Sequence, residues 1–136
     1  MTDTLSPEER SKHMSLIRSK NTHLELRVRR LIYSMGFRYR LHRRDLPGKP
    51  DLVFSPRKKI IFINGCFFHH HKGCSLARLP KSRKNYWIPK LKANAERDTR
   101  NVAALRKIGW RVMCVWECQL KTPQTLILRV KSFLNA

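Results

Sequence analysis

Long hydrophobic runs are absent from this sequence. The longest apolar stretches, such as residues 60–63 and 112–115, are far shorter than the ~20 residues that a membrane-spanning helix needs. Residues 1–9 are acidic and contain no apolar core, so we expect no secretory signal peptide. We therefore expect a cytoplasmic protein, without a membrane partner, in which the cysteines stay reduced and form no disulfide bonds.

Acidic residues are scarce as well. Nine Asp and Glu residues stand against thirty Lys and Arg residues, which gives a formal net charge of +21 and an isoelectric point near 11. A field of this strength attracts polyanions, and nucleic acid is the first candidate. The charge alone does not separate three classes of protein: a nuclease, a passive nucleic-acid binder and a zinc-finger-like regulator.

Repeats, low-complexity tracts and linkers are also missing, so the 136 residues are expected to form a single domain, residues 1–136. Hydrophobic residues make up 41% of the chain, which is typical of a globular protein rather than a disordered one. Helical spacing and turn residues predict helices at 6–20, 22–35, 90–107 and 123–134, and strands at 37–41, 51–54, 60–63 and 110–116. The strands at 51–54 and 60–63 are expected to form a hairpin, and the strand at 110–116 is expected to be buried. This order predicts an α/β fold with a mixed sheet flanked by helices.

A cluster of metal-binding residue types follows the third predicted strand. Five such residues fall within nine positions: Cys66, His69, His70, His71 and Cys74. A closed zinc site needs four ligands, so one of the histidines must join the two thiolates, and the fourth ligand must come from elsewhere. Cys114 and Cys118 lie about 13 Å apart along one strand, so only one of them can reach the metal.

Cys118 stands at the end of that strand and is better placed than Cys114, which we expect to be an inert core thiol. Which histidine binds remains open. The alternative is that all four cysteines are small core residues and the histidines form a basic surface.

Two carboxylates stand out among the few acids. Asp51 follows Pro50 and opens an apolar strand, a position typical of a catalytic metal site. In the matching nuclease pattern the next strand carries an acid, any residue and a Lys, but here it reads Ile61-Phe-Ile-Asn64, so the match is partial.

Asp98 falls on an apolar helical stripe that comprises Leu91, Ala95, Val102, Leu105 and Ile108. A carboxylate on such a face is costly unless it is paired. It either forms a salt bridge with an Arg or orients an imidazole that acts as a general base.

Three aromatic residues, Phe67, Phe68 and Trp87, occur in segments that are otherwise rich in Lys, Arg, Gly and Ser. Aromatic side chains on basic loops stack on bases or wedge between them. Core packing is the alternative for each of them. Two adjacent aromatics are hard to bury from one loop, which favours a wedge for at least one.

These residues together resemble the very-short-patch-repair DNA mismatch endonucleases, from about residue 8 to residue 120. Ser11-Lys-His-Met14 fits the start of the family pattern. Five further blocks occur in the family order: Pro47-Gly-Lys-Pro-Asp51, Ile61-Phe-Ile-Asn-Gly-Cys-Phe-Phe-His-His-His71, Asn94-Ala-Glu-Arg-Asp98, Gly109-Trp-Arg-Val112 and Val115-Trp-Glu-Cys118.

The resemblance implies a restriction-endonuclease-like fold with a structural zinc site. It also implies a magnesium-dependent enzyme that nicks one strand of double-stranded DNA 5′ to the T of a T:G mismatch, the product of 5-methylcytosine deamination. A monomer is expected, with mismatch-repair accessory proteins as partners and an N-terminal arm, residues 1–20, that contacts DNA.

The resemblance also assigns roles to individual residues. Asp51 and the backbone oxygen of Ile63 correspond to magnesium ligands, His69 to the catalytic histidine, Asp98 to its supporting acid and Glu25 to a further catalytic acid. The zinc ligands correspond to Cys66, His71, Cys74 and Cys118. The DNA-contacting residues correspond to Met14, Phe67, Phe68, Trp87, Lys90 and Asn94.

The sequence departs from the family pattern at a few positions. Ile63 stands where the pattern has Thr, and Asn64 where it has His, which removes an imidazole near the scissile phosphate. Phe68 replaces Trp, and Lys72-Gly73 changes the loop before Cys74. Two alternatives stay open: a restriction-type endonuclease that cuts both strands, and a zinc-stabilised DNA-binding protein without catalysis.

Overall fold

The computed structural model describes residues 23–79 and 82–136. The helix expected at residues 6–20, with Met14 and the N-terminal arm, lies outside the described residues. Within them, the chain forms these elements: α2 (His23–Ser34), β1 (Arg40–Leu41), β2 (Leu52–Phe54), β3 (Lys59–Asn64), α3 (Lys84–Lys107), β4 (Arg111–Trp116) and α4 (Pro123–Asn135). Short 3-10 turns occur at Ser55–Arg57, Ser75–Ala77 and Glu117–Lys121.

The four strands form one mixed sheet in the order β1-β2-β3-β4. β2 pairs antiparallel with both β1 and β3, while β3 and β4 run parallel. The expected hairpin and mixed sheet are thus present. In the parallel pair Asn64 lies opposite Trp116, so the segments that follow both strands leave the sheet at the same end of the strands.

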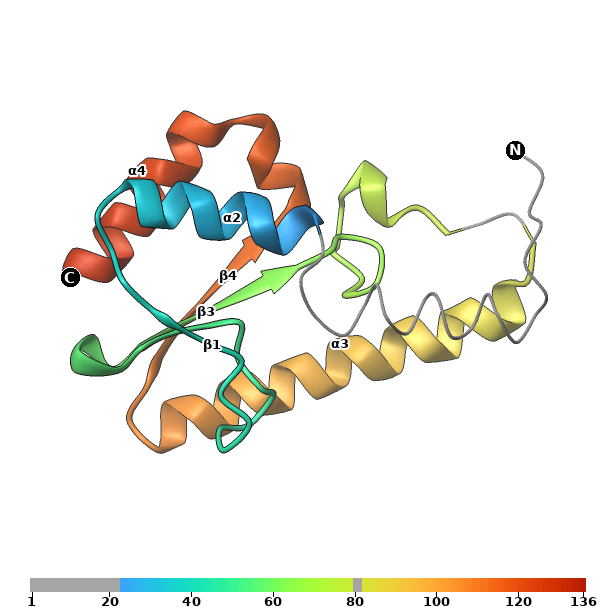
Figure 1. Ribbon diagram of the computed structural model, residues 1–136. Coiled ribbons are helices and arrows are strands. Elements are labelled where there is room, and N and C mark those ends of the chain that lie inside the picture. The colour runs from blue at the N-terminus through green and yellow to red at the C-terminus, as the bar shows by residue number, and fades with distance from the viewer. Residues whose placement is uncertain (1–22, 80–81) are drawn as a thin grey trace.

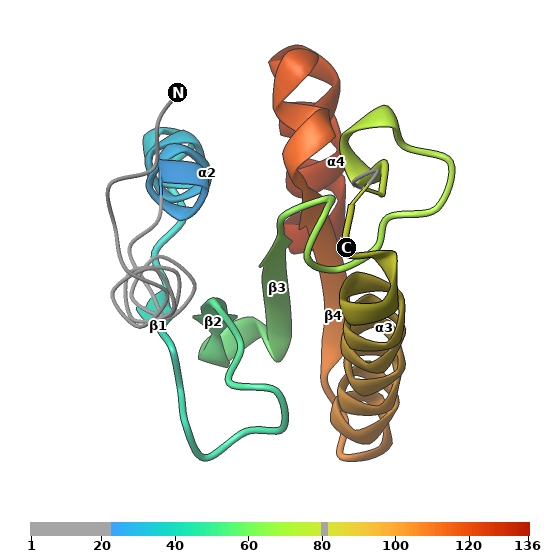
Figure 2. The ribbon, with the colours of Figure 1, turned by 90° about the vertical axis from the view of Figure 1, so that its right-hand side faces the viewer.

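Helices cover both faces of the sheet, with α2 and α4 on one side and α3 on the other (Figures 1 and 2). Alternation along the strands divides the apolar residues between the two faces. Phe54, Ile61 and Val115 pack with α2 and α4, whereas Val53 and Ile60 pack with Leu105 of α3 and with Trp110. These two clusters form the core.

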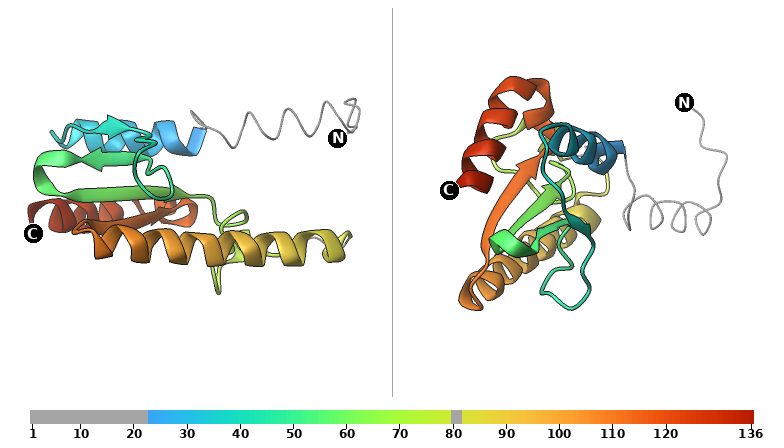
Figure 3. Two further views of the ribbon diagram at one scale, coloured as in Figure 1. Left: turned by 90° about the horizontal axis from the view of Figure 1, so that it is seen from below. Right: turned by 60° about the vertical axis from the view of Figure 1, so that its left-hand side comes forward.

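Several expected boundaries were wrong. β1 contains only residues 40–41 rather than 37–41, because Phe37 and Tyr39 turn toward the α2–α4 core. α3 begins at Lys84, six residues earlier than expected, and passes through Pro89. Trp87 therefore lies inside the helix instead of leading into it, and the N-terminal part of α3 projects beyond the sheet (Figure 3).

Two expectations about burial were also wrong. Ile108 was assigned to the buried stripe of α3, but it follows the last helical residue and is 55% exposed. The strand 110–116 was expected to be buried, yet within β4 only Val115 is. β4 is an edge strand of the described sheet, so its flank lacks a neighbouring strand.

The loop between β1 and β2 packs against α3 through a glycine. Gly48 has a φ of +78°, and a Cβ atom there would come within 2.9 Å of the Asn101 side chain. Any other residue would be strained in this backbone conformation and would collide with α3. Gly48 thus brings the residues before Asp51 close to the helix that carries Asp98.

No helix in the described part of the chain is long and apolar enough to cross a membrane.

Candidate active site and metal centre

A pocket of about 550 Å³ lies at the end of the sheet. Its walls come from α2, the loop between β1 and β2, the end of β3, the following loop, α3 and β4. Four of the expected catalytic residues line it together: Glu25, Asp51, His69 and Asp98. Residues that are distant in sequence are thus gathered around one cavity.

His69 and Asp98 form a hydrogen-bonded pair across this pocket. Nδ1 of His69 lies 2.5 Å from Oδ2 of Asp98, and each side chain is about one-third exposed, at 32% and 34%. With the carboxylate accepting from Nδ1–H, Nε2 is the ring nitrogen left for a substrate. The costly position of Asp98 on an apolar stripe is thereby relieved by an imidazole.

Asp51 is mostly withdrawn from solvent. Its Oδ2 accepts a 2.7 Å hydrogen bond from the backbone N–H of Ile63, and its side chain is 17% exposed. Burial, together with the nearby carboxylate of Glu25, raises the pKa of Asp51 to about 7, against the lowering effect of that hydrogen bond. A nearby cation would stabilise the charged form of such a buried carboxyl group.

His42 joins the carboxylates and was not singled out by sequence reasoning. Its Nε2 lies 3.2 Å from Oε2 of Glu25 and 3.8 Å from Oδ1 of Asp51. Arg29 donates to the same Glu25 oxygen at 2.8 Å. In the sequence His42 stands in the basic run Leu41-His-Arg-Arg44, which gives no signal of a buried site.

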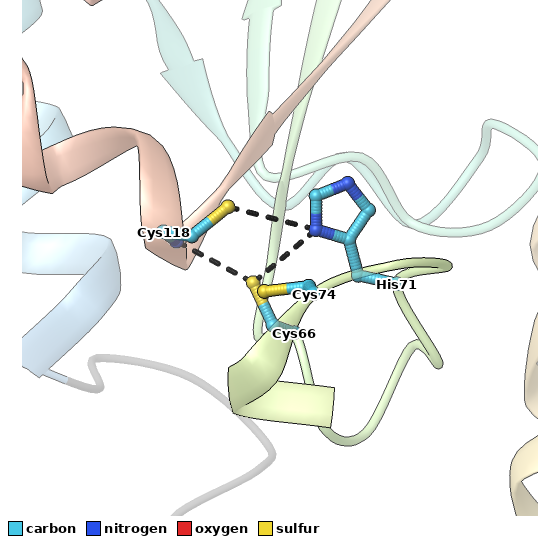
Figure 4. Close-up of side chains that lie close together, drawn as sticks. All are labelled: Cys66, His71, Cys74 and Cys118. Carbon is cyan, nitrogen blue, oxygen red and sulfur yellow. Dashed lines mark hydrogen bonds between the residues drawn. The ribbon is translucent and has the colours of Figure 1, made fainter. Parts of the chain in front are cut away.

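A second cluster gathers three thiols and one imidazole (Figure 4). The side-chain ligand atoms of Cys66, His71, Cys74 and Cys118 all lie within 4.8 Å of one another. Nδ1 of His71 is 3.5 Å from the Cys66 sulfur and 3.6 Å from the Cys118 sulfur. The ring of His71 stacks on Trp116, with centroids 4.0 Å apart and planes inclined by 7°.

The local fold decides which histidine joins these thiols. The chain curls after β3, where the N–H of His71 donates to the Cys66 carbonyl at 2.9 Å and the N–H of His69 donates to the Gly65 carbonyl at 3.1 Å. His71 therefore faces the sulfurs while His69 faces the pocket. Cys118 reaches the cluster from the end of β4, and its backbone N–H donates to the Cys66 sulfur at 3.4 Å.

The donor set fits one tetrahedral metal ion. Zinc bonds of about 2.3 Å to sulfur and 2.0 Å to nitrogen place neighbouring ligand atoms about 3.5–3.8 Å apart. The measured separations of 3.5 and 3.6 Å fall in this range. Burial raises the pKa of the Cys66 thiol to about 12, so a metal that binds there must displace its proton.

Cys114 does not lie in the core, where it was expected. It is only partly buried, and it lines the pocket rather than the core. The reason is that β4 is an edge strand, whose side chains on the α3 side face the pocket where the helix leaves them uncovered.

The aromatic residues form a chain of edge-to-face contacts where the loop meets α3. Ring centroids are 5.2 Å apart for Phe67 and Phe68, 5.1 Å for Phe67 and Trp87, and 5.0 Å for Trp87 and Tyr86. Phe67, Phe68 and Trp87 are partly exposed, and Tyr86, which sequence reasoning missed, is 47% exposed.

Two polar residues of α3 border this aromatic chain. Asn94 donates to the Phe68 carbonyl at 3.0 Å, and the Lys90 ammonium lies 5.6 Å from the Trp87 ring centroid. The expected DNA-contacting residues in the described part of the chain therefore share one surface.

Comparison with known proteins shows to which family this chain is related. The family model of the DNA mismatch endonuclease Vsr matches residues 2–75. The chain is 52% identical over 135 residues to the type II nicking enzyme V.XorIIP of Xanthomonas oryzae pv. oryzae, covering 99% of this chain and 98% of that protein. It is 39% identical over 126 residues to the DNA mismatch endonuclease Vsr of Escherichia coli, covering 93% and 80%. The chain therefore belongs to the Vsr family of DNA mismatch endonucleases.

Proposed function

We propose that this protein nicks one strand of duplex DNA on the 5′ side of the T in a T:G mismatch. The observation that carries the proposal is the hydrogen-bonded pair of His69 and Asp98. This pair lines the same pocket as the buried carboxyl of Asp51. The relatives named as nicking enzymes favour the cutting of one strand over a restriction-type double cut.

Asp51 and the main-chain oxygen of Ile63 would hold Mg²⁺ in this pocket, with Glu25 as a further acid nearby. Oxygen donors of this kind suit Mg²⁺, which keeps several waters of its own. A divalent ion there supplies charge neutralisation at the phosphate and an activated water. The buried, hydrogen-bonded position of Asp51 supports this assignment, because its charged form lacks solvent.

His69 would move the proton in the reaction. Asp98 accepts from Nδ1–H, which fixes the tautomer and leaves Nε2 to exchange a proton with the water or the leaving oxygen. Asp98 also stabilises the imidazolium that forms when Nε2 is protonated. The pair therefore acts as an oriented acid–base group.

The Cys66–His71–Cys74–Cys118 cluster would hold a structural zinc ion. All four positions of a tetrahedral ion are filled by protein atoms, which leaves no open position for chemistry. Its role is to fix the loop after β3, on which His69 lies between two of the ligands.

The aromatic chain would open the DNA at the mismatch. Phe67, Phe68 and Trp87 are partly exposed beside Lys90 and Asn94, which would contact the mismatched bases, and Met14 and the residue 1–20 arm would act from outside the described residues. A mispaired step is already destabilised, so wedging there costs less free energy than in matched DNA. The +21 charge supplies the attraction to the backbone.

A cleavage assay with strand-labelled duplexes tests this function. In the presence of Mg²⁺ we expect a single nick in the T-containing strand of a T:G duplex, and no cut in a matched duplex. Cutting of both strands would indicate a restriction-type enzyme, and binding without cutting would indicate a passive DNA-binding protein.

Asp51→Ala is expected to abolish nicking while DNA binding stays equal or becomes tighter, because a negative charge beside a phosphate is removed. Asp45→Ala is the matched control, since Asp45 lies in the same loop but its side chain is 62% exposed and pairs with Arg43. Nicking at the wild-type rate by Asp51→Ala would refute the proposed metal site.

A further inference from the structure

We propose that His42 is a nitrogen ligand of the catalytic metal centre, so that this protein binds Mn²⁺ in preference to Mg²⁺. The inference rests on the proposed function, because it adds a ligand to the site at Asp51. Its basis is the meeting of one ring nitrogen and two carboxylate oxygens in a single pocket.

The distances suit one shared ion. An ion about 2.1 Å from each ligand atom holds neighbouring ligands about 3 Å apart and opposite ligands about 4.2 Å apart. Nε2 of His42 lies 3.2 Å from the Glu25 oxygen and 3.8 Å from the Asp51 oxygen, and the three ligand atoms all lie within 4.8 Å of one another. The cluster is therefore compact enough for one ion to contact all three residues, provided that the Arg29 guanidinium, now 2.8 Å from the Glu25 oxygen and 3.4 Å from Nε2 of His42, moves aside.

The backbone is shaped to hold the imidazole in this place. His42 has a φ of +47°, a left-handed conformation that a residue with a side chain rarely adopts. Its N–H donates to the carbonyl of Asp51 at 3.3 Å, so the two residues are tied together through the main chain. A strained conformation retained at a polar pocket is typical of a residue placed for function.

The ligand chemistry points to a transition metal. Mg²⁺ prefers oxygen ligands and keeps its waters, whereas imidazole nitrogen is a good ligand for first-row transition metals. A site with two carboxylates and one imidazole therefore favours Mn²⁺ over Mg²⁺. The competing role is that His42 only positions Glu25, with which it also shares a hydrogen bond.

Metal binding without DNA tests the inference on the full chain with the Cys66–His71–Cys74–Cys118 cluster intact. His42→Asn is the informative change, because Asn tolerates the left-handed backbone and loses the imidazole. His23→Asn is the matched control, since His23 is exposed on α2. Pulsed electron paramagnetic resonance of bound Mn²⁺ reports a directly coordinated nitrogen, and titration gives the affinities of Mn²⁺ and Mg²⁺.

We expect a coordinated nitrogen in the wild type and in His23→Asn, and its loss in His42→Asn. The affinity for Mn²⁺ should fall by about 10- to 100-fold, while that for Mg²⁺ changes by less than about threefold. A nitrogen signal that persists in His42→Asn, an Mn²⁺ signal without nitrogen in the wild type, or an equal loss of both metals would overturn the inference. Each of those results would leave the proposed function, nicking that depends on Asp51, intact. A wild-type protein that nicks DNA without binding either ion would instead refute the proposed metal site itself.

Discussion

Asp51 is the residue on which folding and the proposed metal binding place opposite demands. Burial and the nearby Glu25 favour its neutral form, while a divalent ion needs its charged form. Folding raises its pKa from 3.8 to about 7, so between these pH values the folded protein holds a proton that the unfolded chain has lost. The stability of the protein without a divalent ion in the pocket therefore falls as the pH rises through this window.

Asp51→Asn should remove this cost. The amide oxygen can still accept the hydrogen bond from Ile63, and no charge is buried above pH 7. We expect the variant to exceed the wild type in free energy of unfolding by at most ~4 kcal/mol above pH 7, and the gain to vanish near pH 4. Urea denaturation without added Mg²⁺ measures this, with the exposed Asp45→Asn as the control. An equal gain at pH 4 would contradict the assigned cause.

Sequence reasoning at the residue scale succeeded where periodicity carried information. Asp98 was conspicuous because a charge on an apolar stripe needs a partner, and His69 now lies beside it. His42 could not be found in this way, because its position depends on a left-handed backbone and on the loop that returns to Asp51. Cys114 was misplaced because the sequence does not reveal which strand lies at the edge.

At the scale of elements, the loop after β3 is held by residues from two strand ends. Cys118→Ser should lose the proposed zinc ion and most nicking, because His69 shares the loop with the proposed ligands, while the helices and the sheet core remain. Cys114→Ser is the matched control and should keep its metal. Elemental analysis with circular dichroism measures both outcomes. A Cys118→Ser protein that retains one zinc ion per chain would show that the ligand set is wrong.

The wedge that we propose for the loop after β3 and α3 gives a second prediction at this scale. Phe68→Ala should weaken binding to T:G DNA by about 1–3 kcal/mol, the usual contribution of one base–aromatic contact, with little change in Tm. Phe54→Ala is the control, because Phe54 is 2% exposed in the core and its loss should cost about 3–5 kcal/mol of stability. A titration and a melting curve separate the two effects. If Phe68→Ala behaves like Phe54→Ala, Phe68 is a core residue.

Most elements could be predicted, but their limits and surroundings could not. Apolar spacing and turn residues indicated α2, α4 and the hairpin of β2 and β3 closely. The start of α3 was placed six residues too late, and the helix continues through Pro89. The loss of one backbone hydrogen bond at Pro89 is tolerated, and the extension places Trp87 and Lys90 on the helix.

At the scale of the whole molecule, the parallel pairing of β3 and β4 determines where the functional groups meet. Asn64 lies opposite Trp116, so Cys66 and Cys118 follow at the same edge of the sheet. An antiparallel pair would have placed these two cysteines at opposite ends. The direction of pairing depends on how α3 crosses between the strands, which local sequence patterns do not encode.

The order of the cluster residues along the chain has a consequence for protein synthesis. Cys66, His71 and Cys74 emerge from the ribosome early, but they cannot complete their four-residue cluster until Cys118 has followed β4. Until then the loop that carries His69 lacks its contacts with Cys118, and β4 has not added to the sheet that forms the pocket. We therefore expect a nascent chain of this endonuclease to be inert, and its activity to begin only when β4 and Cys118 have been made.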